Sequence, residues 1–165
     1  MKVKPIIVGV TAIAALGLSG TAAAGGGHAK FKTVRVTFQP TDFEFGPSAA
    51  PCDAGGTCLE TTTIKAVQTG DLDGATVEAD ASSAVGTNPR QTTVMGTFTG
   101  GVTGCGKNGS FLYNGLRTDT APDRSEATYL IMPGTGTGDF DGISGVMQQH
   151  ALGGPITGVF RCKVH

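Results

Sequence analysis

Apolar and polar residues alternate along much of the chain, which is typical of β-strands that bury one face. The alternation is clear in residues 33–39 and returns in residues 156–164 at the C-terminal end. Pro40 is expected to end the first strand, and residues 41–57, which are rich in proline and glycine, are expected to form a loop. The strands predicted in this way span 33–39, 59–67, 75–85, 92–99, 109–117, 126–132, 146–152 and 156–164.

Glycine-rich turns separate the predicted strands. The longest is residues 133–145, PGTGTGDFDGISG, and the related run TGDLDG at 69–74 matches TGDFDG at 137–142 in all but one position. Glycine adopts positive φ at no steric cost, so these runs predict tight turns between antiparallel strands. About eight short strands joined in this way predict an all-β antiparallel barrel, with a β-sandwich as the alternative. The residues expected to build the turns are Gly70, Asp71, Asp73, Gly74, Gly138, Asp139, Asp141 and Gly142.

Strand 75–85 offers two different faces. Val77 and Ala79 lie on one face, and Glu78 and Asp80 lie on the other. We expect the apolar face to point into the barrel and the two carboxylates to point to solvent. If the barrel instead encloses a polar pocket, the same carboxylates become candidate acids.

The first 24 residues have the pattern of an export signal. Lys2 and Lys4 precede an apolar stretch at 6–18, and three alanines at 22–24 form a small-residue cleavage site. The apolar stretch is shorter than the roughly 20 residues that cross a bilayer, so no membrane span is expected after the signal is removed. The sequence therefore predicts a secreted protein.

The remaining chain is expected to form one domain. Residues 25–32 are predicted to be a flexible leader and residues 33–165 a single β-barrel domain. Without the signal, ten basic residues face thirteen acidic ones, and the basic residues do not cluster. This mildly acidic balance argues against a nucleic-acid partner or an anionic membrane surface. The oligomeric state is left open.

Four cysteines follow the signal, at positions 52, 58, 105 and 162. An even number of cysteines in an exported chain predicts two disulfides. Of the three pairings, Cys52–Cys58 and Cys105–Cys162 are favoured, since the first closes a short loop and the second joins a hairpin tip to the last strand. A zinc site is the alternative, but the spacing matches no standard zinc pattern.

The segment GTGDFDGISG at 136–145 resembles the G-[ST]-G-x-F-x-G-x-x-G hairpin of allene oxide cyclase-like barrels, and plant dirigent proteins carry a related turn. Within that superfamily the chain is most similar to a bacterial family of unknown function, over roughly residues 62–150. The motifs that carry the resemblance lie at 70–74, 96–100, 109–111 and 133–145. The resemblance implies a barrel whose interior is the functional surface. The cyclases isomerise an oxidised fatty acid there, and dirigent proteins steer radical coupling.

Few residues could carry acid–base or metal chemistry. His150 is the only histidine inside the predicted domain, and no G-x-S-x-G nucleophile motif occurs. The paired aspartates of the two like turns could suit calcium, but the further ligands of a calcium loop are missing, so we expect them to cap turns. No metal or cofactor is expected. The residues predicted to line a cavity are Phe111, Tyr113, Tyr129, His150 and Phe160.

Three functions stay open at this point. The first is binding of a small apolar molecule inside the barrel. The second is a cyclase- or isomerase-type enzyme that uses the same interior, although the sparse acid–base residues argue against it. The third is an extracellular structural or interaction module with a filled core. A cavity that combines a tyrosine with a carboxylate would favour the enzyme.

Overall fold

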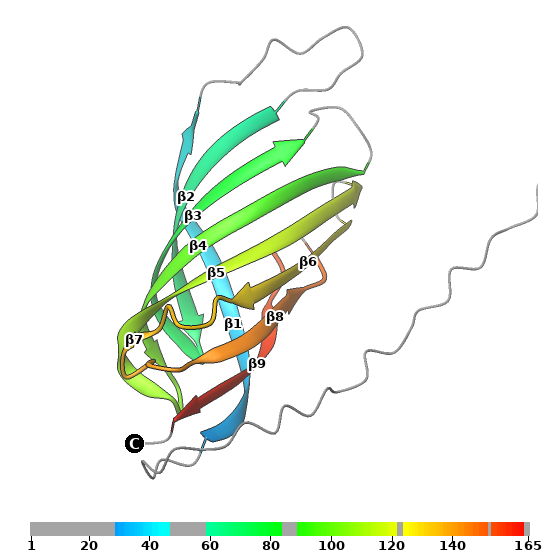
Figure 1. The fold of residues 1–165 in the computed structure, drawn as a ribbon. Helices are drawn as coiled ribbons and strands as arrows, with labels where there is room; N and C mark the ends of the chain where they lie inside the picture. Colours follow the sequence, from blue (N-terminus) through cyan, green and yellow to red (C-terminus); the bar gives the residue numbers. More distant parts are fainter. Residues whose placement is uncertain (1–28, 47–58, 84–88, 122–123, 152, 164–165) are drawn as a thin grey trace, which may run out of the picture.

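The computed structural model describes residues 29–46, 59–83, 89–121, 124–151 and 153–163, which form nine β-strands and no helix (Figure 1). Among these residues there is thus no apolar helix of a length that crosses a membrane. The strands are β1 (Ala29–Phe45), β2 (Leu59–Gly70), β3 (Leu72–Ser83), β4 (Arg90–Val102), β5 (Gly106–Ala121), β6 (Arg124–Ile131), β7 (Thr137–Gly138), β8 (Ser144–Gln149) and β9 (Ile156–Lys163).

All the strands belong to one antiparallel sheet that closes on itself. Its order is β4-β3-β2-β1-β9-β8-β6-β5, and β5 pairs back with β4 to complete the ring. The two-residue strand β7 adds to β5 within the long turn before β8. The prediction of an all-β antiparallel fold is confirmed, and the sheet forms one ring rather than the two layers of a sandwich.

Strand β1 is longer than the sequence pattern predicted. Ala29–Lys32, assigned to the leader, pair with β9, and residues 42–45, assigned to the loop, pair with β2. Pro40 does not end the strand because the register shifts between Pro40 and Asp42, and such an irregularity tolerates a residue without an N–H. The predicted signal and the first leader residues, up to position 28, lie outside the described residues, as do residues 47–58 of the predicted loop.

The ring is taller on one side than on the other. Strands β2 to β5 rise well above β8 and β9 in Figure 1. Strand β1 pairs with β9 only as far as Val36, so its continuation to Phe45 pairs with β2 alone. We call the end of the ring at which β1 and β5 finish the open end, and the opposite end, which carries the β2–β3 and β4–β5 turns, the hairpin end.

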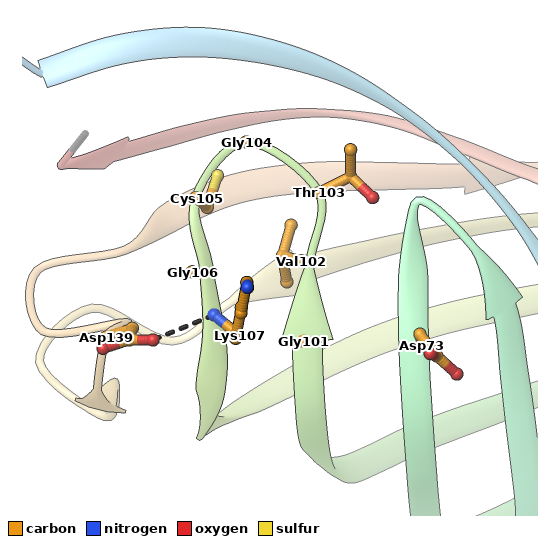
Figure 2. A pocket seen from close by; sticks show the side chains of 9 residues that line it. All are labelled: Asp73, Gly101, Val102, Thr103, Gly104, Cys105, Gly106, Lys107 and Asp139. Carbon is orange, nitrogen blue, oxygen red and sulfur yellow. Dashed lines mark hydrogen bonds between the residues drawn. The ribbon is translucent and has the colours of Figure 1, made fainter. Parts of the chain in front are cut away.

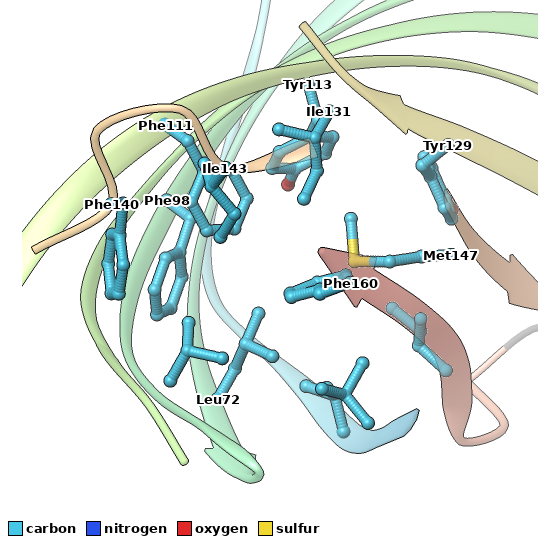
Figure 3. Close-up of a cluster of buried hydrophobic side chains, with 14 of the residues drawn as sticks. Leu72, Phe98, Phe111, Tyr113, Tyr129, Ile131, Phe140, Ile143, Met147 and Phe160 are labelled. Carbon is cyan, nitrogen blue, oxygen red and sulfur yellow. The ribbon is translucent and has the colours of Figure 1, made fainter. Parts of the chain in front are cut away.

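The hairpin end is filled by hydrophobic side chains (Figure 3). Phe140, from the glycine-rich turn, is fully buried and packs at 5.8 Å and 6.4 Å, ring centre to ring centre, from Phe111 and Phe98. Phe160 of β9 meets Phe111 edge-on at 6.0 Å. This aromatic cluster, with Leu72 beneath it, makes the lower half of the ring a packed core rather than a channel.

A disulfide closes the core at the hairpin end. Cys105, in the turn between β4 and β5, is bonded to Cys162 of β9, with a Cα–Cα distance of 5.5 Å. This is the pairing that the sequence predicted for these two residues. Cys52 and Cys58 lie outside the described residues.

The turn aspartates bind backbone groups of neighbouring strands. Asp71 accepts a hydrogen bond from the Arg35 N–H at 2.9 Å, and Asp139 accepts from the Lys107 and Asn108 N–H groups at 2.8 Å and 3.1 Å. Asp141 is exposed and forms an ion pair with a lysine of β9. Among the described residues no three metal-ligating side chains come together. Asp71 and Asp139 therefore cap backbone N–H groups of neighbouring strands, whereas Asp141 binds a lysine side chain instead. Glycines 70, 138 and 142 of the same turns have positive φ.

Candidate functional site

Strand β3 turns its polar face inward, opposite to the prediction. Glu78 and Asp80 are 5% and 4% exposed, whereas Val77 is 49% exposed and points outward. The first residue of the strand, Leu72, is fully buried and points into the ring. Because side chains two residues apart lie on the same face of a strand, the even-numbered residues that follow also point inward. The alternation within residues 75–85 does not include Leu72, and therefore predicted the wrong inward face.

The interior near the open end is polar as a result. Neighbouring strands contribute to it in one continuous band, since the β-ladders pair Ser82 with Thr92, Thr92 with Arg117, and Asp119 with Ser125. The buried or half-buried polar side chains of this band are Glu78, Asp80, Ser82, Arg90, Thr92, Arg117, Asp119, Ser125 and Gln149.

A cavity of about 300 Å³ lies beside this polar band. Hydrophobic side chains line one part of the cavity, and polar side chains line the other part, which we call its inner end. The lining residues are Phe38, Pro40, Phe43, Ile64, Glu78, Arg117, Tyr129, Gln149, Gly153 and Ile156. The cavity is thus amphipathic and has a volume suited to a small organic molecule.

A larger hollow lies at the hairpin end (Figure 2). It has a volume of about 780 Å³ and is lined mainly by the glycine-rich turn between β4 and β5. Its charged side chains, Asp73, Lys107 and Asp139, are exposed or half-buried, and Asp139 already accepts backbone hydrogen bonds. This hollow therefore offers little chemistry for a specific ligand, and we take the smaller interior cavity as the candidate site.

A glycine on β4, which has no side chain, allows Glu78 and Tyr113 to meet. The β-ladders align Glu78 of β3, Gly96 of β4 and Tyr113 of β5 in one row. A Cβ atom at Gly96 would lie 2.2 Å from Cζ of Tyr113, so the tyrosine ring occupies the space above the glycine. From there the Tyr113 hydroxyl donates a hydrogen bond of 2.5 Å to Glu78 Oε1. Only glycine at position 96 permits this contact.

Tyr129 is also positioned by a glycine on a neighbouring strand. Its ring lies against Gly115 of β5, where a Cβ atom would approach Tyr129 Cδ1 to 2.5 Å. The rings of Tyr113 and Tyr129 meet edge-on, with centres 5.9 Å apart. The Tyr129 hydroxyl donates a hydrogen bond to Gln149 Oε1 at 3.4 Å. Both tyrosines are thereby held in defined positions at the inner end of the cavity.

Arg117 is bound on two sides by carboxylates. Its Nη1 lies 3.4 Å from Oδ2 of Asp80, and its Nε lies 3.4 Å from Oδ2 of Asp119. The three side chains are 16%, 3% and 20% exposed, so these ion pairs are largely removed from solvent. The cation stabilises the two buried carboxylates, which would otherwise be costly to ionise.

Burial changes the proton affinity of the acids. It raises the pKa of Glu78 to about 7; the charge of Asp80 adds to the increase, and the Tyr113 hydrogen bond and Arg117 oppose it. Burial likewise raises the pKa of Asp80, against the charge of Arg117. The pKa of each tyrosine is raised as well, mainly by burial and then by the charge of Glu78. At neutral pH the cavity therefore holds a carboxyl group that is close to half-protonated.

The five residues predicted to line a cavity lie in three different places: at the cavity, in the aromatic core and on the outer surface. Tyr129 lines the cavity, and Tyr113 contacts it through Glu78. Phe111 and Phe160 are fully buried in the aromatic core. His150 points outward and pairs with Glu126 at 2.7 Å, with 68% of its side chain exposed, so it is not part of the site.

Several cavity residues were missed from the sequence. Glu78 was expected to face solvent, and Arg117 and Gln149 were not singled out. Phe43 belonged to a predicted loop but extends β1 beside the cavity. The apolar Leu72 could have fixed the inward face of β3, and on β5 the two-residue spacing from Phe111 and Tyr113 could have placed Arg117 on the inward face.

Comparison with known proteins gives a family. Residues 34–157 match the family described as "Protein of unknown function (DUF3224)". The chain belongs to the DUF3224 family. A crystal structure of a DUF3224 protein from Shewanella oneidensis MR-1, described as of unknown function, is similar in fold, with a TM-score of 0.59 and 18% identity. The similarity covers 84% of this chain and 99% of that one. No curated protein matches the chain.

Membership of DUF3224 agrees with the bacterial family of unknown function that the glycine-rich motifs indicated. At 18% identity the solved relative supports the closed-sheet fold and carries no site residues over to this chain. The wider relationship to allene oxide cyclase-like barrels stays a prediction.

Proposed function

We propose that this DUF3224 protein binds a small amphipathic molecule in the cavity at the open end of the ring. The observation that carries the proposal is the cavity itself, about 300 Å³, with aromatic and aliphatic walls and a buried carboxyl group at its inner end. Pockets of this composition are typical of small-molecule sites. The polar inner end makes the ligand amphipathic, rather than the mainly apolar molecule expected from the sequence.

Two sequence features extend the proposal. The export pattern of residues 1–24 implies that binding takes place outside the cytoplasm. The resemblance of residues 136–145 to the hairpin of allene oxide cyclase-like barrels supports a ligand held inside the ring, because relatives of known function use that interior.

Binding can be tested with the purified, oxidised protein. Native mass spectrometry should show an excess mass that is lost on denaturation, and N-phenyl-1-naphthylamine should bind saturably with increased fluorescence. Ile64→Trp places a large ring in the cavity and should abolish both signals. Val67→Trp is the matched control, since Val67 lies on the same strand and points outward. If no mass is carried and the dye responds equally to both variants, the proposal is wrong.

A second candidate function is acid–base catalysis in the same cavity. It is favoured by one observation: Glu78 lines the cavity and burial raises its pKa to about 7, which suits a group that both accepts and donates a proton at neutral pH. In this hypothesis the Glu78 carboxylate removes a proton from a carbon beside a carbonyl group, the C–H electron pair forms an enolate, and the proton returns at another carbon.

The catalytic hypothesis has a direct test. The protein is incubated in deuterium oxide with a panel of small cyclic ketones and unsaturated ketones, and loss of the α-proton signals is followed by NMR. The protein should accelerate exchange, and Glu78→Gln should remove the acceleration. Equal exchange with the wild-type protein, the variant and buffer would rule out this chemistry for substrates of that class.

A further inference from the structure

The polar end of the cavity carries an excess of carboxyl groups. Glu78, Asp80 and Asp119 are grouped around a single arginine, Arg117. The next arginine along the band, Arg90, is paired with a fourth carboxylate, that of Glu60, at 3.3 Å. When the acids are ionised, the inner end of the cavity is therefore net negative.

Arg117 is poorly placed to receive an anionic ligand. Its guanidinium group already contacts the carboxylates of Asp80 and Asp119 and donates a hydrogen bond to Thr92 Oγ1 at 3.4 Å. An incoming carboxylate or phosphate would have to displace these groups and would meet their negative charge. The charge arrangement thus disfavours anions.

Glu78 offers an unused acceptor to the cavity. Its Oε1 accepts the hydrogen bond from the Tyr113 hydroxyl. The residue is 95% buried and lines the cavity. A carboxylate can accept about four hydrogen bonds, and the contact with Tyr113 uses one of these sites. The group is therefore placed to accept from a donor inside the cavity.

Three aromatic side chains line the same cavity as this acceptor. These residues are Phe38 and Phe43 of β1 and Tyr129 of β6. The faces of aromatic rings attract organic cations, most strongly where water is excluded. The rings and Glu78 thus favour the same kind of ligand group.

We propose that the ligand of this cavity is an organic cation, a protonated primary or secondary amine whose N–H groups bind Glu78 and whose apolar body lies against Phe38, Phe43 and Ile64. This inference rests on the proposed binding function and specifies the chemical class of the ligand.

Binding of a cation beside Glu78 should release a proton from its carboxyl group. The positive charge stabilises the ionised carboxylate, so a Glu78 that is close to half-protonated in the free protein at neutral pH releases a proton when the amine binds. The affinity for an amine should then increase between pH 6 and pH 8, and the affinity for an anion should decrease. The titratable and charged groups that act on the site are Glu60, Glu78, Asp80, Arg90, Tyr113, Arg117, Asp119 and Tyr129.

The test compares three probes of equal shape: 3-phenylpropylamine, 3-phenylpropan-1-ol and 3-phenylpropionate. Their dissociation constants are measured by isothermal titration calorimetry at pH 6 and pH 8. The amine should bind at least tenfold more tightly than either analogue at pH 8, and its affinity should increase by up to roughly tenfold between the two pH values. Glu78→Gln should remove both effects, because the amide has a similar shape and no charge. Glu126→Gln, at an exposed acid, is the matched control and should change neither.

The outcomes separate this inference from the binding function. If the alcohol or the carboxylate binds as tightly as the amine, or if Glu78→Gln leaves the amine's preference intact, the inference is wrong while the cavity remains a binding site. If the dye binds the wild-type protein but not Ile64→Trp, and none of the three probes binds at millimolar concentration, the assignment of the ligand as an amine also fails. Failure of the dye and mass tests would instead remove the binding function itself.

Discussion

The Tyr113 hydroxyl reaches Glu78 across a strand that separates their two strands in the sheet. Tyr113 belongs to β5 and Glu78 to β3, and the hydrogen bond of 2.5 Å passes over Gly96 of the intervening β4. In an antiparallel sheet a side chain at the middle position would keep the two apart. The absence of a side chain at one glycine is therefore what connects the acid of the candidate site to its hydrogen-bond donor.

Gly96→Ala should disrupt this contact and destabilise the protein. The added methyl group would lie within 2.6 Å of three atoms of Tyr113, so the ring must move away and the hydrogen bond must lengthen or break. Overpacking of this kind costs about 1–3 kcal/mol, measured as the change in the free energy of unfolding in urea. The matched control is Thr97→Ala, the exposed neighbour on the same strand, which should change stability by less than about 0.5 kcal/mol. Equal stability of the two variants would contradict the role assigned to Gly96.

The stability of the protein should decrease as pH rises toward neutrality. Glu78 binds its proton more tightly in the folded state, where its pKa is about 7, than in the unfolded state, where an ordinary glutamate has a pKa of 4.5. The folded state thus holds more protons between these values, and this contribution to stability is lost as pH rises through 7. Chemical denaturation should show a loss of roughly 2–3 kcal/mol between pH 5 and pH 8 from this group.

Glu78→Gln provides the control for that pH dependence. The amide oxygen can still accept from Tyr113, but the side chain no longer titrates. The difference in unfolding free energy between variant and wild type should therefore grow from pH 5 to pH 8 in favour of the variant. Asp80, whose pKa is also raised by burial, contributes a pH dependence of the same sign in both proteins. Parallel pH profiles for both proteins would show that Glu78 titrates normally.

The sequence predicted the fold class well because strands and turns are local features. The alternation around Phe111 and Tyr113 gave the correct buried face of β5, and Ile156 and Phe160 did the same for β9. The glycine-rich turns were found because their residue types follow from backbone geometry alone. Closure of the sheet into a ring also agreed with the predicted class.

The candidate site was harder to predict, because it depends on which residues face inward on several strands at once. On β3, Val77 and Ala79 alternate with Glu78 and Asp80 as expected, but the acidic face points into the ring and the apolar face points outward. Hydrophobicity alone assigns the apolar face to the interior, whereas the ring places it outside and stabilises the inward acids with Arg117 from β5. Such a pairing across strands cannot be seen in a single strand's sequence.

The disulfide should contribute substantially to stability. Cys105 and Cys162 are 57 positions apart, and in the chain-entropy model a crosslink of that length destabilises the unfolded chain by about 4 kcal/mol. The double variant C105S/C162S should therefore unfold at a markedly lower temperature than the oxidised wild type. Reduction of the wild type with dithiothreitol should lower its midpoint at least to that of the oxidised variant. The variant's own midpoint should change much less, because only the predicted Cys52–Cys58 disulfide, which closes a short loop, could still be reduced there. A large effect of the reductant on the variant would assign the stabilisation to other cysteines.

Phe140 should anchor the glycine-rich turn to the core. It is fully buried, and the loops on both sides bend around it: the Phe140 N–H donates to the carbonyl of Thr137 at 3.1 Å, and its carbonyl accepts from the Ile143 N–H at 2.9 Å. Phe140→Ala removes a ring that packs against Phe98 and Phe111, and such truncations cost about 3–5 kcal/mol.

The measurement for Phe140 is hydrogen exchange together with global unfolding. If the ring anchors the turn, amides of residues 134–143 should lose protection in Phe140→Leu, a milder variant that should remain folded, while those of β2 and β3 keep theirs. Asp141→Ala is the matched control, since the side chain of this exposed neighbour forms a surface ion pair with Lys163 and its loss should leave both readouts nearly unchanged. Uniform loss of protection across the whole sheet in Phe140→Leu would mean that the turn and the ring unfold as one unit, and that Phe140 stabilises the core in general rather than the turn in particular.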